Sequence, residues 1–144
     1  MLPKIKRLLK EKDICVLATV CENQPHCSLM AYVADDEGRQ IYMVTLRDTK
    51  KFKNLTQNPA VSLLIDTRED DAGLQRSRAK ALTVNGVFER VEREKQAPIQ
   101  ARILERHPHL QELLARGEAE IFAVRVESFQ LLEGATDSHF ERVD

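Results

Sequence analysis

The residues best suited to chemistry are a threonine and two adjacent lysines at the start of a short predicted helix. The stretch "RDTKKFKNLTQNP", residues 47–59, places Thr49, Lys50 and Lys51 in the first turn. A helix N-terminus carries partial positive charge, so each lysine there costs roughly 0.3–1 kcal/mol unless an anion binds. Free backbone N–H groups, a hydroxyl and two ammonium groups could together hold a phosphate. Composition alone favours the alternative that both lysines extend into water, because exposed lysines are common.

The cysteines do not form a pattern typical of a metal site or a disulfide framework. Cys15, Cys21 and Cys27 fall within 13 residues, and "CENQPHC" also contains His26. The spacing lacks the paired C-x-x-C arrangement of a zinc site. We interpret the cysteines as small apolar residues at strand ends. No other pattern requires an acid, a base or a nucleophile, so we name no catalytic residue and no metal ligand.

Composition places the chain among ordinary globular proteins. Its 144 residues predict a single domain over 1–144, in which the polar tail 135–144 is a candidate flexible segment. The formal net charge is -1, which gives no general case for nucleic acid or an anionic membrane as partner. No apolar run is long enough to span a bilayer, and the N-terminus lacks the apolar core of a signal peptide. We therefore expect a cytoplasmic protein.

Alternating and β-branched stretches predict the elements that must position the helix start. Tight turns separate the first three strands, and Gly86 inside the fifth indicates a bulge or a barrel corner. Apolar residues on both faces of several strands favour a closed barrel and a dimer that covers the outer face. Six mostly antiparallel strands are predicted, over residues 14–20, 26–34, 40–46, 60–66, 79–92 and 119–134.

Helices are predicted at three places along this order. One precedes the first strand, and the lysine-bearing helix lies between strands three and four, with Phe52 and Leu55 on one face. Two more begin near Pro98 and Pro108, between strands five and six, and the second, over 108–117, has Leu110, Leu113 and Leu114 facing inward. The polar stretch 67–78 is expected to be a mobile loop. The fold class is therefore mainly β (α+β), a six-stranded antiparallel split β-barrel with short helices.

The strand-turn-helix-strand unit from residue 41 to residue 65 resembles the flavin-binding split-barrel family, also called pyridoxamine 5'-phosphate oxidase-like. That family has a threonine closing the strand, a serine or threonine and a lysine at the helix start, and "NP" before the next strand. Thr45, Thr49, Lys51 and the Asn58–Pro59 pair match this pattern. The resemblance extends over the opening helix and from Ile14 to about Leu132.

The resemblance implies that FMN lies in a groove between two subunits of a homodimer. Lysine and threonine side chains at the helix start would hold the phosphate, while strand three would contact the flavin. The second strand would line the flavin mainly through its backbone. The implied cofactor-binding residues are Ser28, Leu29, Met30, Val44, Thr45, Thr49, Lys50 and Lys51.

Two departures indicate that the chain is not a true pyridoxamine phosphate oxidase. Members with that activity carry an arginine on the second strand and a lysine at its end, where this chain has "SLMAYVA". Their basic, Trp- and Arg-rich C-terminal segment is also missing, since the chain has no Trp and ends "SHFERVD". The prediction is an FMN-binding protein, an oxidoreductase of unknown substrate, whose hold on FMN the missing arginine weakens.

Two alternatives remain. Some relatives in this family bind haem through a histidine, and the candidates are His26, His107, His109 and His139, which we interpret as surface residues. The other is a non-enzymatic binding or stress-related module that kept the fold without firm cofactor binding.

Overall fold

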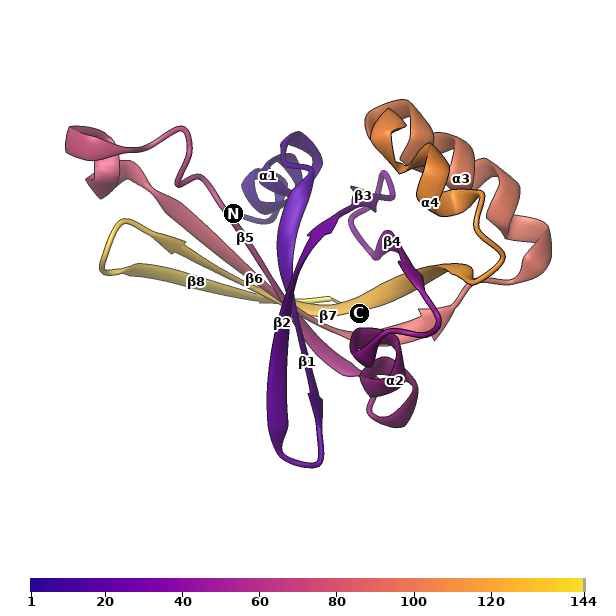
Figure 1. Ribbon diagram of the computed structural model, residues 1–144. Helices are drawn as coiled ribbons and strands as arrows, with labels where there is room; N and C mark the ends of the chain where they lie inside the picture. The colour runs from indigo at the N-terminus through magenta and orange to yellow at the C-terminus, as the bar shows by residue number, and fades with distance from the viewer. Residues whose placement is uncertain (144) are drawn as a thin grey trace.

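The computed structural model describes residues 1–143 and contains one curled sheet in which all neighbouring strands are antiparallel (Figure 1). The mainly β prediction is confirmed. The eight strands are β1 (Ile14–Cys21), β2 (Gln24–Ala31), β3 (Val33–Ala34), β4 (Gln40–Leu46), β5 (Ala60–Asp66), β6 (Lys80–Arg90), β7 (Ala119–Glu133) and β8 (Asp137–Arg142).

The pairing order explains why the sheet is barrel-like. Strands follow the order β2-β1-β5-β6-β7-β4-β3, with β8 added beside β7. The two ends of this path, β2 and β3, are separated along the chain only by Tyr32. One bent stretch of chain therefore pairs with β1 at one end and with β4 at the other, which brings the two margins of the sheet together.

The predicted count of six strands is wrong at two places. The strand expected over 26–34 breaks at Tyr32, whose buried phenol donates a hydrogen bond to the carbonyl of Leu9 at 2.7 Å. The tail expected as a candidate flexible segment forms β8, which pairs with the end of β7. Its polar side chains hide the strand from a hydrophobicity pattern. Residue 144, the last of that tail, lies outside the described residues.

Helices occur at the three expected places, but their limits differ. The helix expected from Pro98 begins at Arg93 and contains Pro98, and the one expected over 108–117 is a 3-10 turn followed by a short helix. The stretch 67–78 contains a 3-10 helix. The helical elements are α1 (Leu2–Glu11), α2 (Lys50–Gln57), η1 (Gly73–Arg78), α3 (Arg93–Arg106), η2 (Pro108–Leu110) and α4 (Gln111–Leu114).

The bulge predicted at Gly86 is confirmed and has a packing reason. The register between β6 and β7 shifts between Asn85 and Gly86. A Cβ atom on Gly86 would lie 2.5 Å from the carbonyl oxygen of Arg125 and 2.7 Å from a methyl carbon of Val124. Only glycine lets the two backbones approach this closely.

Two hydrophobic clusters hold the elements together. The larger fills the barrel beneath α1, with Leu9, Leu17 and Phe122 fully buried. The smaller lies where α3 covers β3, β4 and β7, and it includes Val44 and Ile103. The first cluster fixes the barrel, and the second fixes the helices that border β4.

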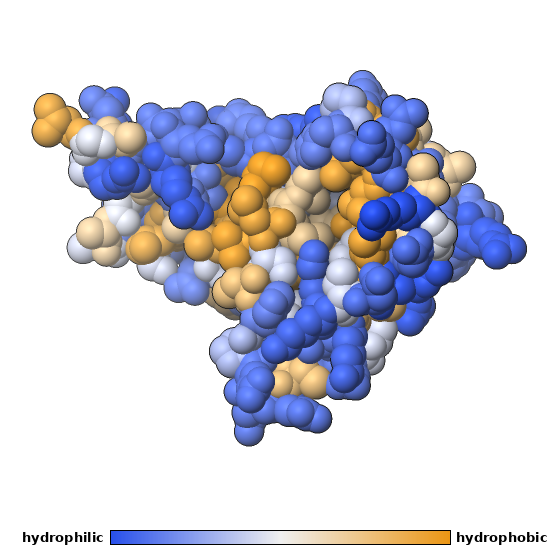
Figure 2. All heavy atoms as spheres, in the orientation of Figure 1, coloured by the Kyte–Doolittle hydropathy of each residue, from blue (hydrophilic) through white to orange (hydrophobic). Residues whose placement is uncertain are grey.

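The outer face of the barrel carries exposed apolar side chains. Leu29, Val16 and Leu64 are successive cross-strand neighbours on β2, β1 and β5, and Leu29 is 75% exposed. Ile14 and Phe140 add further exposed apolar surface. Figure 2 shows hydrophobic side chains gathered in the middle of this face, over the region where β1, β2 and β5 cross. We call the set Ile14, Val16, Leu29 and Leu64 the outer apolar face.

Candidate functional site

The start of α2 is held by a threonine cap. Thr49 has an extended backbone, and its hydroxyl oxygen accepts a hydrogen bond from the backbone N–H of Phe52 at 3.2 Å. The same hydroxyl donates to the carbonyl of Leu46 at 2.8 Å, which ties the helix to the end of β4. Thr45 lies beside it, with 3.5 Å between the two hydroxyl oxygens. The cap thus brings two hydroxyl groups to the end of β4.

Lys51 is directed from this helix start toward β2. Its ammonium nitrogen lies 3.2 Å from the sulfur of Met30, a weak acceptor. The side chain is half-buried, and this burial lowers the pKa of Lys51 from its ordinary value. No acidic residue lies in the first turn of α2. The site therefore presents a partly desolvated cation that has no carboxylate within ion-pair distance among residues 1–143.

These groups lie in one groove of about 250 Å³. β2 and the end of β4 supply two walls, the start of α2 supplies the polar end, and η2 with α4 borders the remaining side. Apart from Lys51 and two threonines, the groove is apolar. The lining residues are Leu29, Met30, Ala31, Val44, Thr45, Leu46, Thr49, Lys51, Leu110 and Leu113.

Of the eight residues predicted to bind the cofactor, six line this groove and two do not. Lys50 faces a separate depression of about 700 Å³ beside α2, together with Arg47 and Lys53. Ser28 lies outside the groove, although its side chain is on the same face of β2 as that of Met30, which lines it. The residues brought together are Leu29, Met30, Val44, Thr45, Thr49 and Lys51.

Sequence reasoning missed four residues of the groove lining, which are Ala31, Leu46, Leu110 and Leu113. Leu110 and Leu113 are half-buried and join the smaller hydrophobic cluster. Their spacing in the stretch 108–117 did indicate an inward-facing side. The pattern could not indicate which distant strand that side would meet, and the structure places it beside β4.

The histidines occupy four different environments, none of them in the groove. The expectation of a surface position is wrong for His107, which is 3% exposed and whose Nε2 lies 2.9 Å from the carbonyl oxygen of Tyr32. His109 is exposed, His26 is half-buried, and His139 lies 3.7 Å from a carboxylate oxygen of Glu133. Among the residues that line the groove, Met30 is the only one with an atom of the class that ligates haem iron.

The cysteines are free thiols in separate positions. Cys15 is buried in the barrel core, and burial raises its pKa to about 12, which keeps the thiol protonated and unreactive. Within residues 1–143, no group of three or more His, Cys, Asp or Glu side chains is placed to hold a metal ion. In the same range, no helix is long and apolar enough to cross a membrane.

Comparison with known sequences gives one family match. The sequence profile of the family described as "Pyridoxamine 5'-phosphate oxidase" matches residues 1–133, which is all of the chain except the β8 hairpin end. No curated protein is significantly similar in sequence.

Several solved structures share the fold. A heme binding protein from Mycobacterium smegmatis has a TM-score of 0.85 at 18% identity, over 96% of this chain. The chain spans only 56% of that protein's length. HutZ, the heme storage protein from Vibrio cholerae, has a TM-score of 0.74 at 26% identity, with 92% of this chain and 93% of that one covered. A FAD-binding protein from Mesorhizobium loti has a TM-score of 0.73 at 21% identity, with 94% and 96% covered.

Proposed function

Since the chain belongs to the pyridoxamine 5'-phosphate oxidase family, we propose that its groove binds FMN and that the protein is a flavin-dependent oxidoreductase. One observation carries the proposal. Lys51 is a half-buried ammonium with a thioether as its hydrogen-bond partner, beside the hydroxyl groups of Thr45 and Thr49. A phosphate is a far stronger acceptor than a thioether, and hydrogen bonds between ionised groups are the strong ones.

The groove fits the two chemically different ends of FMN. The phosphate would be held by Lys51 with the Thr45 hydroxyl as a further donor, since the Thr49 hydroxyl already donates to the carbonyl of Leu46. The flavin would lie against apolar residues such as Leu29 and Val44. Bound FMN supplies the redox chemistry, since the lining includes no carboxylate, histidine or thiol to act on a substrate. The role of the protein is to orient the flavin and exclude water from it.

The site also supports a homodimer as the functional form. A volume of about 250 Å³ lies below the roughly 300–1,000 Å³ typical of ligand pockets, so one subunit supplies an incomplete site. Leu29 belongs both to the groove and to the outer apolar face, and it is 75% exposed. A second copy that covered this face would also wall the groove.

Oxidation of pyridoxamine phosphate is not the activity we propose. The stretch that follows Cys27 and ends at Ala34 contains no charged residue that could hold a second phosphate. The proposed substrate is an unidentified small molecule that exchanges electrons with the flavin.

Haem is the second candidate ligand, and the apolar lining favours it. Two of the similar solved structures are described as a heme binding and a heme storage protein. Lys51 could pair with a propionate, and Met30 is the lining residue able to ligate iron. We rank haem second because the groove has no histidine and its polar end is formed by groups that suit a phosphate.

Parallel titrations of the purified protein with FMN, riboflavin and hemin test these assignments. We expect micromolar affinity for FMN and at least about tenfold weaker binding of riboflavin, which lacks the phosphate. Equal affinity for the two flavins would show that Lys51 does not bind the phosphate. A Soret band on hemin addition, with no flavin binding, would replace FMN by haem. FMN binding without turnover by reduced nicotinamide would favour a non-enzymatic module.

A further inference from the structure

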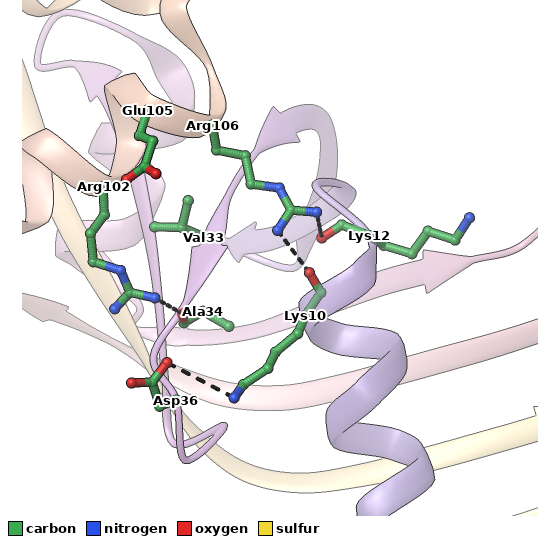
Figure 3. A pocket seen from close by; sticks show the side chains of 8 residues that line it. All are labelled: Lys10, Lys12, Val33, Ala34, Asp36, Arg102, Glu105 and Arg106. Atoms are coloured by element: carbon green, nitrogen blue, oxygen red, sulfur yellow. Dashed lines mark hydrogen bonds and ion pairs between the residues drawn. The ribbon is translucent and has the colours of Figure 1, made fainter.

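A second cleft lies between the end of α1, β3 and α3 (Figure 3). Its volume is about 430 Å³, within the range of small-molecule sites. Val33 and Ala34 form its apolar floor. Four of the residues that line it are cationic and two are acidic. Neither the sequence patterns nor the family assignment gives this cleft a role.

Arg102 is the cation best placed to bind a ligand in this cleft. One of its N–H groups donates to the carbonyl of Ala34 at 2.6 Å, and this bond fixes the guanidinium over the cleft. A guanidinium has five N–H donors, so most remain for another partner. Within residues 1–143, no carboxylate lies within ion-pair distance of Arg102. Its charge is thus held in place by backbone and left unneutralised.

Arg106 adds a second fixed positive charge. Its guanidinium donates to the carbonyls of Lys10 and Glu11, each at 2.8 Å, and so caps the C-terminal end of α1. Its nearest carboxylate, that of Asp13, is 3.9 Å away. These hydrogen bonds use N–H donors of the guanidinium. Arg106 therefore acts on the cleft mainly through its positive charge and less through free hydrogen-bond donors.

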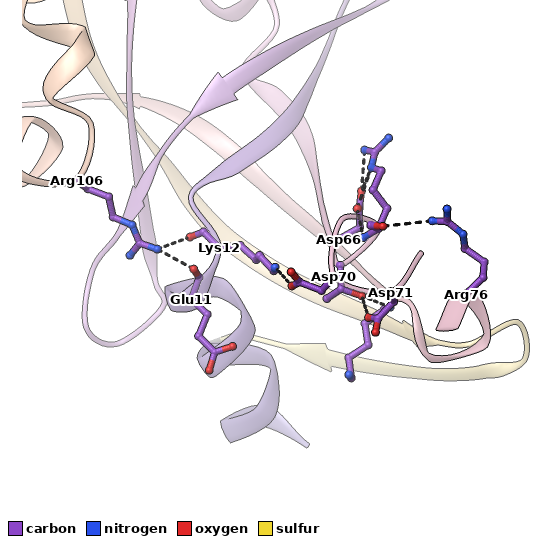
Figure 4. A network of polar contacts seen from close by, with 10 residues as sticks. Glu11, Lys12, Asp66, Asp70, Asp71, Arg76 and Arg106 are labelled. Carbon is purple, nitrogen blue, oxygen red and sulfur yellow. Dashed lines mark hydrogen bonds and ion pairs between the residues drawn. The ribbon is translucent and has the colours of Figure 1, made fainter. Parts of the chain in front are cut away.

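The other charged side chains divide between the cleft and its surroundings. Lys12 is paired with Asp70 in the polar network of Figure 4 and points away from the cleft. Lys10 points into it and reaches Asp36 at 3.9 Å. The Asp36 side chain is 92% exposed, so this contact is weak and an anion could replace it. Glu105, the second acid, forms no ion pair among the described residues.

We propose that this cleft binds a small anion that carries a carboxylate or a phosphate. Arg102 would be its principal ligand and Lys10 a second, with the field of Arg106 behind them. The planar guanidinium fork matches both anion types. This site is separate from the FMN groove, because the two share no lining residue.

Titration with citrate and, separately, with inorganic phosphate tests the proposal. The readout is the shift of backbone amide NMR signals of Lys10, Ala34 and Asp36. A Lys51→Gln background removes any phosphate bound in the groove. We expect saturable shifts at about 1 mM or lower for at least one of the two probes.

Charge-matched variants then locate the anion. Arg102→Gln should weaken binding at least about tenfold, and Lys10→Gln, which removes no backbone bond, about two- to fivefold. The control is Arg93→Gln, which changes the charge of the same helix at an exposed residue outside the cleft. We expect it to bind as the background protein does.

The proposal is overturned if neither probe gives saturable shifts in the cleft. It is also overturned if Arg93→Gln weakens binding as much as Arg102→Gln, because the effect would then be one of general charge. If Arg102→Gln does not fold, an unchanged anion affinity in Lys10→Gln overturns the proposal.

Discussion

The ammonium nitrogen of Lys51 lies 3.2 Å from the sulfur of Met30, across the groove between α2 and β2. A thioether is among the weakest acceptors that a protein can offer to a charged donor. The contact fixes the direction of the lysine without neutralising it. The free protein therefore holds a cation aimed at β2, ready for a better acceptor.

Removal of this cation should weaken FMN by the worth of a hydrogen bond between charged groups. We expect Lys51→Gln to reduce FMN affinity by about 1.5–3 kcal/mol, and to leave riboflavin affinity nearly unchanged. Fluorescence titration of both flavins with both proteins gives the four values. Lys53→Gln, an exposed lysine on the same helix outside the groove, is the control. An equal loss of affinity for both flavins would mean that Lys51→Gln acts through the folding of the protein and not through contact with the phosphate.

The affinity for FMN should also fall as pH rises, earlier than for an ordinary lysine. Burial lowers the pKa of Lys51 below 10.5, and phosphate binding requires the ammonium form. Affinity is therefore lost as pH rises through this lowered pKa. Titrations between about pH 7 and about pH 10 follow the loss. An affinity independent of pH in Lys51→Gln, beside a falling one in the wild type, confirms the assignment.

The same pKa shift has a predicted effect on the stability of the protein without FMN. Because the folded state releases the Lys51 proton more readily, the unfolded state binds more protons between the lowered pKa and 10.5. The contribution of Lys51 to the free energy of unfolding therefore rises with pH over this window. Urea unfolding measures the free energy of unfolding of the wild type and of Lys51→Met. The value of the wild type minus that of the variant should increase as pH rises. A decrease of this difference with rising pH would contradict burial as the cause of the lowered pKa of Lys51.

The bulge in β6 gives a test of the barrel itself. Gly86→Ala should reduce the free energy of unfolding by roughly 1–3 kcal/mol, because the added methyl group would meet the backbone of Arg125. Gly117→Ala is the matched control, since no atom lies within 4 Å of its added methyl group. Urea unfolding should find the control within about 0.5 kcal/mol of the wild type. Equal losses in both would contradict the packing seen at Gly86.

The outer apolar face is predicted to be covered by a second copy. Leu29→Glu places a charge in the middle of this face and should convert a dimer of the 16.5 kDa chain into a monomer. Light scattering after size-exclusion chromatography measures the mass. Leu74→Glu is the control, because Leu74 is 99% exposed on η1 and lies outside the outer apolar face. A monomeric wild type would refute the homodimer.

The sequence predicted the parts of the site that are close together along the chain. Thr45, Thr49 and Lys51 belong to one strand-turn-helix unit, so their local geometry follows from strand alternation and the threonine cap. Met30 lies on β2, and the bent stretch of chain formed by β2 and β3 brings it to the same groove. Leu110 was missed because a helical pattern defines an apolar side but not its distant partner.

The remaining errors have local physical reasons. The break at Tyr32 carries no glycine or proline and depends on a hydrogen bond to α1, which only the tertiary structure supplies. The strand β8 was missed because it pairs on one edge and is largely exposed, so its sequence lacks the apolar alternation of a half-buried strand.

The pairing of β4 with β7 sets the order in which the groove can form during synthesis. Val44 and Thr45 of β4 are held in register by Ile121 and Glu120 of β7. The ribosome completes β4 long before it makes β7. The hairpin of β1 and β2 needs only neighbouring residues, whereas this long-range pairing must wait for nearly the whole chain. The groove is therefore among the last features to take shape, and the ligand site proposed there forms only once β7 is in place.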